Sequence, residues 1–211
     1  MNVLLVKANN RPDGISTKMY ETFLENVQDA GALNVQTYDV FEEDTPYFGQ
    51  DFFDAFGRLA TDGEPTEMDR RVLAAKQKAK DAFSAADLVV FAFPLWNLTI
   101  PAKLQTFIDY IAEAGYTFKY SPEGALVPLM PEKKVIFLNA RGGVYSAPEM
   151  AGMDMALTYM QNIFGGLYGM DIVDEVVIEG HNANPDQAEE IIEAGLKEVA
   201  EAASRVAYQK V

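Results

Sequence analysis

The sequence predicts an α/β fold: a doubly wound parallel sheet of five strands, in the order 2-1-3-4-5, with helices on both faces. Five short, nearly continuous apolar runs recur along the 211 residues, as expected of parallel strands buried on both faces. Segments in which apolar residues have helical spacing separate these runs, so strand and helix alternate to the end. Five strands fit this order better than a longer, six-stranded version. We expect one domain over residues 1–211.

The first part of the chain supplies two strands and the helix between them. Residues 3–6 form a continuous apolar run, which predicts the first strand. Apolar residues then recur at helical spacing as far as Val27, with Ser16 as the predicted N-cap, and Gly31 ends this helix. Residues 35–40 are the predicted second strand.

The segment between residues 42 and 63 is acidic and aromatic, and it has no clear period. We assign it no element. Its aromatic side chains could form core, a pocket wall or a subunit interface, and a long aromatic loop favours the last two. The aromatic residues in and beside it are Phe41, Tyr47, Phe48, Phe52, Phe53 and Phe56.

The middle of the chain continues the alternation. Residues 66–69 resemble a capping box, which predicts a helix from there to about Ala85. Residues 88–93 are almost all apolar and form the predicted third strand. Pro101 then opens a helix that runs through Ile111, since proline is favoured at the first helical position.

The last part of the chain supplies the remaining strands and helices. Residues 134–139 are the fourth strand, and the Arg-Gly-Gly sequence at 141–143 ends it. A helix is predicted for about 149–164, and the fifth strand for 172–178. An Asn-Pro pair caps the last helix, which spans about 184–208.

Composition excludes several kinds of chemistry. The chain has no cysteine and one histidine, so disulfides, a thiolate nucleophile and cysteine-ligated metals are absent, and we expect no metal site. A formal net charge of -15 opposes binding to nucleic acids or anionic membranes. No apolar run approaches the length that spans a bilayer, and no signal peptide is apparent, so we expect a cytoplasmic protein.

Ligands of such sheets bind beyond the carboxyl ends of the strands, so the loops after the first, third and fourth strands are the candidate binding loops. The first loop leads through Gly14 into a helix start that carries Ser16, Thr17 and Lys18. Free N–H groups, hydroxyls and a cation at this place favour an anion such as a phosphate. The alternative is that Ser16 only caps the helix.

The loop after the third strand runs from Pro94 to Pro101 and contains the only tryptophan, Trp96, beside Asn97. Large apolar side chains and an amide at this edge suit a flat heteroaromatic ring. The alternative is a rigid loop whose Leu95 and Trp96 fill core.

The loop after the fourth strand offers Gly142 and Gly143, which let a backbone approach a ligand closely or serve a tight turn. The glycines at 165–169 end a helix and precede a strand, the reverse of a dinucleotide fingerprint, so we interpret them as a helix C-cap and turn. His181 is interpreted as a surface-loop residue.

No set of catalytic side chains is evident, and we predict none. Chemistry without cysteine, metal or triad indicates an organic cofactor that supplies the reactivity. A phosphate site and a ring site in such a sheet favour FMN over NAD as the bound group.

These loops resemble the FMN-dependent NADH-azoreductases, the flavodoxin-like quinone reductases of bacteria. The strongest similarity is Phe93–Leu98 with Ile100 and Pro101, followed by Arg141–Gly143 and by the Ala-Gly-Tyr-Thr-Phe sequence at 114–118. The resemblance covers essentially the whole chain. Lys18, Ala140 and Trp96 depart from the family pattern.

The resemblance implies a flavodoxin-like fold and a set of binding residues. Phosphate would lie near Asn9 and the helix start, and the flavin ring between the third and fourth loops. The predicted cofactor-binding residues are Asn9, Ser16, Thr17, Lys18, Pro94, Leu95, Trp96, Asn97, Leu98, Asn139, Arg141, Gly142, Gly143 and Tyr145. Tyr120, Phe164 and Phe53 are the predicted substrate-pocket residues, across a homodimer interface.

The implied activity is a two-step oxidoreductase reaction, with tightly bound, non-covalent FMN. NADH delivers a hydride to FMN and leaves, and a quinone or azo compound then takes its place and is reduced. The protein would orient both reactants against one flavin face. The alternative is an electron carrier of the flavodoxin type, whose acidic surface would suit basic redox partners.

Overall fold

The computed structural model describes residues 1–27 and 30–208, and its centre is a parallel sheet. The five strands lie in the order β2-β1-β3-β6-β7, so the predicted order 2-1-3-4-5 is confirmed. Every neighbouring pair in this sheet is parallel. The strands are β1 (Asn2–Lys7), β2 (Asn34–Asp39), β3 (Leu88–Pro94), β6 (Lys134–Arg141) and β7 (Asp171–Glu179).

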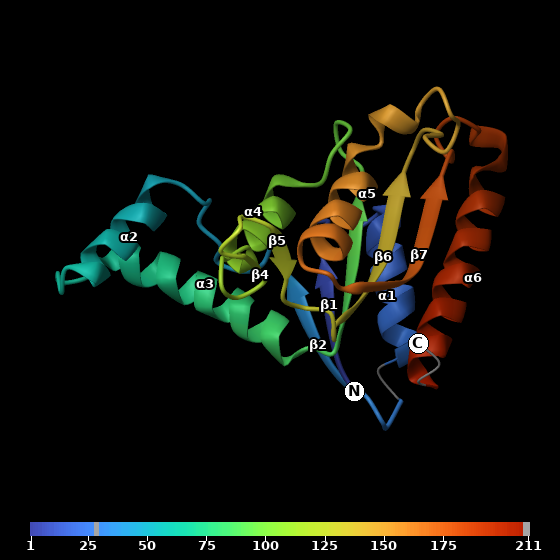
Figure 1. Cartoon of the computed structure of the whole chain (residues 1–211). Coiled ribbons are helices and arrows are strands. Elements are labelled where there is room, and N and C mark those ends of the chain that lie inside the picture. The colour runs from blue at the N-terminus through green and yellow to red at the C-terminus, as the bar shows by residue number, and fades with distance from the viewer. Residues whose placement is uncertain (28–29, 209–211) are drawn as a thin grey trace.

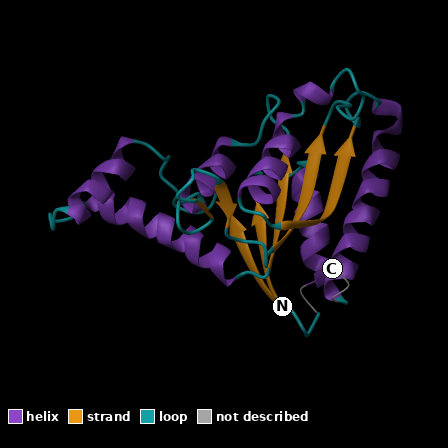
Figure 2. Ribbon diagram, viewed as in Figure 1, coloured by secondary structure: helices purple, strands orange, loops and turns teal. Residues whose placement is uncertain are grey.

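Helices cover both faces of this sheet (Figures 1 and 2). One face is covered by α1 (Ile15–Val27) and α6 (Ala188–Ala207), and the other by α3 (Glu67–Ala85), α4 (Ala102–Ile111) and α5 (Met155–Met160). Each residue of β3 is buried, and successive side chains enter opposite cores: Val90 packs with α1 and α6, and Phe91 with the other layer. This two-sided burial is the physical reason for the unbroken apolar runs.

A helix that the sequence analysis missed forms half of a projecting arm. Here α2 (Gln50–Ala60) packs on α3, and the pair extends away from the sheet (Figure 1). Phe52 and Ala55 are the buried residues of α2. The Arg58 guanidinium joins the two helices, because it binds the buried carboxylate of Asp69 at 2.5 Å. The helical spacing of apolar residues could not be recognised in the sequence, because both the buried and the exposed faces of α2 carry phenylalanine.

Asp69 also completes the predicted capping box of α3. The Thr66 hydroxyl accepts the Asp69 N–H at 3.1 Å, and the Asp69 carboxylate accepts the Thr66 N–H at 2.8 Å. These bonds and Arg58 lower the pKa of Asp69, the Arg58 hydrogen bond most strongly. The carboxylate therefore stays ionised although it is buried.

The structure corrects the predicted limits of several helices. Ser16 lies inside α1 and does not cap it, because the helix begins at Ile15. The predicted helix at 149–164 divides into η1 (Ala151–Met153), α5 and η2 (Gln161–Leu167), since Asp154 caps a new start at α5.

The last helix differs in the same way. A short turn, η3 (Pro185–Gln187), precedes α6, so Asn184 caps no long helix. The first helix was predicted to end at Gly31. In the structure α1 ends at Val27 and Gly31 lies in a turn, and residues 28–29 between them are outside the described residues.

A small antiparallel hairpin, β4 (Phe118–Tyr120) with β5 (Leu126–Pro128), was also not predicted. Three-residue strands carry too short a pattern to detect.

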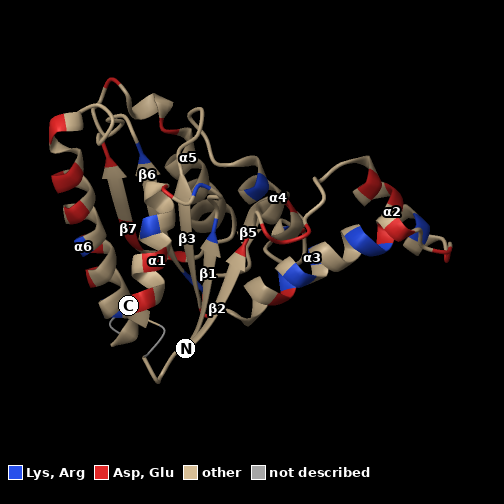
Figure 3. Ribbon diagram, turned by 180° about the vertical axis from the view of Figure 1, so that it is seen from behind, with Lys and Arg blue, Asp and Glu red and all other residues tan. Residues whose placement is uncertain are grey.

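Acidic residues recur along α6, where they are exposed, whereas α2 and α3 carry both signs (Figure 3). Among residues 1–27 and 30–208, no helix has the length and apolar character needed to cross a membrane.

Candidate functional site

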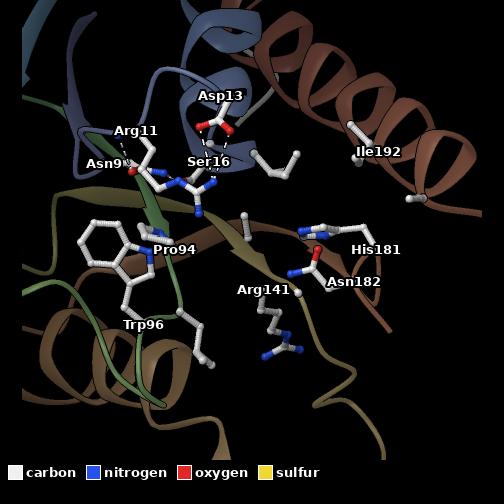
Figure 4. A pocket seen from close by; sticks show the side chains of 16 residues that line it. Asn9, Arg11, Asp13, Ser16, Pro94, Trp96, Arg141, His181, Asn182 and Ile192 are labelled. Atoms are coloured by element: carbon white, nitrogen blue, oxygen red, sulfur yellow. Dashed lines mark hydrogen bonds and ion pairs between the residues drawn. The ribbon is translucent and has the colours of Figure 1, made fainter. Parts of the chain in front are cut away.

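A cleft of about 400 Å³ opens at the carboxyl ends of four neighbouring strands (Figure 4). The loops after β1, β3, β6 and β7 line it, together with Ala188 and Ile192 at the start of α6. The three loops predicted from the sequence therefore do meet in space. The loop after β7 was not predicted, and it contributes His181 and Asn182.

The loop after β1 is fixed by its own side chains. Asn9, which is buried, donates from Nδ2 to the Ser16 hydroxyl at 2.8 Å and accepts the Arg11 N–H at 3.0 Å. Gly14 is required here, because a Cβ atom would lie 2.3 Å from Asn9 Nδ2. The first-turn N–H groups of α1, which have no intrahelical acceptor, thus lie beside the cleft at Ser16.

The cation in this part of the cleft is Arg11, which the sequence analysis missed. Lys18 is exposed and, like Thr17, lies outside the cleft lining; the Thr17 hydroxyl donates to the Arg11 carbonyl at 2.9 Å. Arg11 pairs with Asp13 at 3.3 Å, and both side chains are largely exposed. The Arg11 hydrogen bond lowers the pKa of Asp13.

The loop after β3 is a tight turn that presents Trp96. The Trp96 N–H donates to the Thr99 carbonyl at 2.9 Å, and the Thr99 N–H returns a bond of 3.1 Å. Asn97 and Leu98, at the tip, have φ of 49° and 71°. A left-handed leucine is strained, and such strain is concentrated at functional sites. Pro94, Leu95 and Trp96 line the cleft, whereas Asn97 and Leu98 lie outside its lining.

The loop after β6 is anchored by Arg141, whose guanidinium points away from Arg11 and Ser16 (Figure 4). This side chain is 6% exposed, and its Nε donates to Glu179 at 2.9 Å while Nη1 binds Asp154. Arg141 was predicted to bind cofactor. It lines the cleft, and its guanidinium binds two protein carboxylates, so it fixes the loop on which Gly142 and Gly143 lie; its contact with a cofactor stays a prediction.

Glu179 extends the same network. Its carboxylate accepts the Tyr145 N–H at 2.8 Å and the Ser146 N–H at 3.2 Å. Partial burial acts to raise the pKa of Glu179, but the hydrogen bonds from Ser146 and Tyr145 and the charge of Arg141 outweigh it and lower the pKa. The carboxylate is therefore held ionised. The Tyr145 side chain lies outside the cleft lining.

Gly142 lies at a close contact between the loops after β6 and β7. Its carbonyl accepts the Asn182 N–H at 3.0 Å, and a Cβ atom at Gly142 would lie 2.2 Å from Asn182 Nδ2. The glycine pair was predicted to permit close approach, and here the approach is to another loop of the chain. Gly143 lies against the Tyr145 ring and outside the cleft lining.

Two polar atoms near the cleft have no partner within the described residues: Nδ1 of His181 and Oδ1 of Asn139. Burial lowers the pKa of His181, so its neutral form is favoured. His181 lies in a surface loop, as expected, and the sequence analysis missed that this loop lines the cleft. Asn139 is fully buried and donates to the Phe93 carbonyl at 3.2 Å, below the cleft.

The predicted substrate-pocket residues do not meet in one chain. Phe164 was expected there, but it is fully buried and packs on Phe91 with ring centroids 4.6 Å apart. Phe53 on α2 and Tyr120 on β4 are 58% and 64% exposed and lie outside the cleft lining.

The arrangement fits a flat ring with an anionic tail. A helix N-terminus and Arg11 form the anionic end, while Pro94, Leu95 and Trp96 form an apolar wall. The unpartnered His181 Nδ1 can meet a polar ring edge, as buried polar atoms require partners. Within the described residues no group of three His, Asp or Glu side chains could hold a metal ion.

Comparisons with known proteins agree with this geometry. Residues 1–203 match the family described as Flavodoxin-like fold. FMN-dependent NADH:quinone oxidoreductase 3 of Bacillus cereus is 48% identical over 206 residues, which cover 96% of this chain and 98% of the relative.

Solved structures give the same result. The azoreductase AzrA superposes with a TM-score of 0.87 at 47% identity, covering 97% of this chain and 100% of the other. An azoreductase from Bacillus anthracis str. Sterne superposes with a TM-score of 0.86 at 46% identity, covering 97% and 99%.

Proposed function

The chain belongs to the flavodoxin-like fold family, and on that premise we propose that it is an FMN-dependent NADH:quinone oxidoreductase that also reduces azo compounds. The observation that carries the proposal is the cleft itself. Its helix N-terminus and Arg11 suit a phosphate, and the wall from Pro94 to Trp96 suits a flavin ring. Residues 1–211 would act as one FMN-binding domain.

Bound FMN would supply the redox chemistry that the side chains lack, namely hydride transfer from NADH to the oxidant. The chain would bind and orient. Asn9 and Ser16, which are hydrogen-bonded to each other, would hold the helix start against the phosphate, and Leu95 and Trp96 would pack on the ring. Backbone N–H groups of the Gly142 loop would meet the ring edge, where they stabilise negative charge.

Several predicted contacts lie outside the cleft lining: Thr17, Lys18, Asn97, Leu98, Gly143 and Tyr145. They remain proposals. The turn that carries Asn97 and Leu98 directly follows Trp96, so a bound ring stacked there would come within reach of both residues.

We also propose a cytoplasmic homodimer with its active sites at the interface. Exposed apolar side chains gather on the arm, where Phe53, Phe56 and Leu59 are 58%, 40% and 48% exposed. Contiguous apolar surface of this kind is rare on monomers. A second copy would cover the arm and bring Phe53 and Tyr120 to its neighbour's cleft. Light scattering tests this: a dimer is expected, and a monomer at micromolar concentration would refute it.

Steady-state kinetics test the proposed reaction. Initial rates are measured on the FMN-loaded enzyme while NADH and a soluble benzoquinone are both varied. If the two reactants use one place in turn, double-reciprocal plots run parallel. Intersecting plots would contradict the shared site, and the absence of quinone reduction would contradict the activity. The same assay with NADPH tests whether NADH is the preferred donor.

A further inference from the structure

The two loops that would hold the flavin ring are both bonded to the start of α5, at Asp154 and Met155. We infer that Asp154 is a positioning residue, which holds the loop after β6 at a fixed distance from the loop after β3. This spacing sets how strongly the cleft binds the ring in each redox state. The inference rests on the proposed function and adds to it a residue outside the cleft lining.

The bond to the loop after β6 is an ion pair with little access to solvent. Asp154 Oδ2 binds Nη1 of Arg141, and the two side chains are 12% and 6% exposed. Arg141 directly precedes Gly142, and both residues line the cleft. The second carboxylate on Arg141 is that of Glu179, which belongs to β7. Asp154 therefore ties this loop to α5, whereas Glu179 ties it to the sheet.

The bond to the loop after β3 comes from the next residue in the chain. The Met155 N–H donates to the Leu98 carbonyl at 3.1 Å. The first N–H groups of a helix have no partner inside the helix, and the Leu98 carbonyl satisfies that of Met155. Leu98 has a φ of 71°, which leucine rarely adopts, so this bond supports a strained turn. It fixes the tip of the loop that presents Trp96.

Asp154 joins these two bonds because it also caps the helix. Its Oδ1 accepts the Leu157 N–H at 3.1 Å, while Oδ2 binds Arg141. The cap fixes the first turn of α5 and therefore the direction of the Met155 N–H. One carboxylate thus connects the loop after β6 to the helix turn that supports the loop after β3.

The sheet itself joins these loops at their bases. The Leu95 N–H donates to the Ala140 carbonyl at 2.8 Å, which continues the pairing of β3 with β6. Trp96 and Gly142 lie beyond this bond and line the cleft, so their separation depends on the bonds at the start of α5. The backbone N–H groups of the Gly142 loop would stabilise negative charge on the reduced ring from hydrogen-bond distance. A wider separation therefore weakens the binding of reduced FMN more than that of oxidised FMN.

The first test is Asp154→Asn, which keeps an oxygen to cap α5 and removes the charge that binds Arg141. The dissociation constant of oxidised FMN is measured by quenching of flavin fluorescence, and the two-electron reduction potential of bound FMN is measured against a reference dye. We expect oxidised FMN to bind about 10-fold more weakly and reduced FMN about 100-fold more weakly. This tenfold difference lowers the reduction potential by about 30 mV.

Asp174→Asn is the matched control. Asp174 on β7 binds Nη2 of Arg205, and its side chain is 20% exposed, so the same change breaks an arginine–carboxylate pair outside the cleft lining. Urea unfolding measures the stability that each variant loses. The control should leave the affinity for FMN and the reduction potential unchanged. A shift confined to Asp154→Asn is then no consequence of general destabilisation.

Met155→Pro tests the second bond. Proline is favoured at the first helical position, which Met155 occupies, and it lacks the N–H that reaches Leu98. The helix therefore remains while that bond is lost. Met155→Ala is the control, because it keeps the N–H and removes the same side chain; the residue is 48% exposed. We expect Met155→Pro to lower the affinity and the potential as Asp154→Asn does, and Met155→Ala to change neither.

The inference is overturned if Asp154→Asn shifts the potential no more than Asp174→Asn, or if oxidised and reduced FMN lose equal affinity. If Asp154→Asn does not fold, Met155→Pro decides, and a result equal to that of Met155→Ala overturns the inference. These outcomes leave the proposed function in place when the wild-type protein binds FMN and reduces quinones. A wild-type protein that binds no FMN would refute the proposed function and this inference together.

Discussion

Two arginines at one cleft differ in what their charge is bound to. Arg141 is buried, and its guanidinium is shared by Asp154 and Glu179. Arg11 is exposed and touches one exposed carboxylate, that of Asp13. A buried and fully paired cation maintains the shape of a loop, whereas an exposed and weakly paired one can exchange its partner for a ligand. The conspicuous Arg-Gly-Gly motif therefore carries a structural arginine, and the inconspicuous loop after β1 carries the available one.

The largest expected difference is in stability. Arg141→Leu leaves Asp154 and Glu179 without their cation in a site that is mostly buried, so we expect the free energy of unfolding to fall by about 3–5 kcal/mol. Arg11→Leu should lower it by less than about 1 kcal/mol, because its ion pair is exposed. Urea unfolding of the flavin-free proteins, followed by far-UV circular dichroism, measures both. Equal losses would remove the distinction between the two arginines.

A second prediction concerns the glycine beside Arg141. Gly142→Ala places a Cβ atom 2.2 Å from Asn182 Nδ2, so the loops after β6 and β7 must separate. We expect a loss of about 1–3 kcal/mol in stability and weaker FMN binding. Adding Asn182→Ala removes the atoms that clash, and the double variant should recover most of the loss. A double variant as impaired as Gly142→Ala would show that the glycine is needed for another reason.

A third prediction concerns how stability depends on pH, and it compares the carboxylate of Glu179 with that of Asp13. The pKa of Glu179 is lowered from its usual 4.5, so its contribution to stability is complete above about that pH and is lost as the pH falls through the lower, folded-state value. Glu179→Gln should therefore flatten the acid side of the stability curve, by at most about 1.4 kcal/mol per pH unit for one proton.

Asp13→Asn is the matched comparison, since the pKa of Asp13 is also lowered but its carboxylate is exposed. It should flatten the curve less, because solvent screens its ion pair. Urea unfolding between pH 3 and pH 7 measures both slopes. A steeper curve for Glu179→Gln than for the wild type would contradict the sign.

The smallest expected effect is in the loop after β3. Leu98→Gly turns the tip into Asn-Gly, the preferred pair for a turn with two positive φ angles, so we expect stability to rise by about 0.5–1 kcal/mol. If Leu98 contacts the flavin, as the family resemblance implies, FMN binding weakens at the same time. Thermal unfolding and FMN titration separate the two effects. A destabilised variant would show that Leu98 contributes more by packing than it costs by strain.

The sheet was predictable because burial on both faces leaves a simple pattern in the sequence. A short, unbroken apolar run such as residues 88–93 is typical of a strand buried on both faces, and alternation with helices then restricts the strand order. The arm was not predictable for the opposite reason. Phe52 is buried while Phe53 and Phe56 are exposed, so the apolar pattern of α2 does not distinguish inside from outside. Surface aromatics of this kind suit the proposed homodimer, and a single sequence does not show which residues a second copy would cover.

The cleft was predictable as a set of loops but less so as a set of side chains. Strand order places the ends of β1, β3 and β6 together, whatever residues follow them. Which side chain enters the cleft depends on rotamers and local bonds. Lys18 and Arg11 lie seven residues apart in the sequence on either side of Gly14, and only the turn between them decides that Arg11 lines the cleft. His181 carried no signal beyond its place after the fifth strand.

The most direct test of the proposed enzyme is an anaerobic titration of the FMN-loaded protein with NADH, followed by the visible absorption of the flavin. We expect prompt bleaching that is complete at one NADH per FMN, and full recovery of colour when a benzoquinone is added. A bound flavin that NADH leaves oxidised would contradict direct hydride transfer in this cleft, and with it the central claim that the chain is an NADH-dependent oxidoreductase.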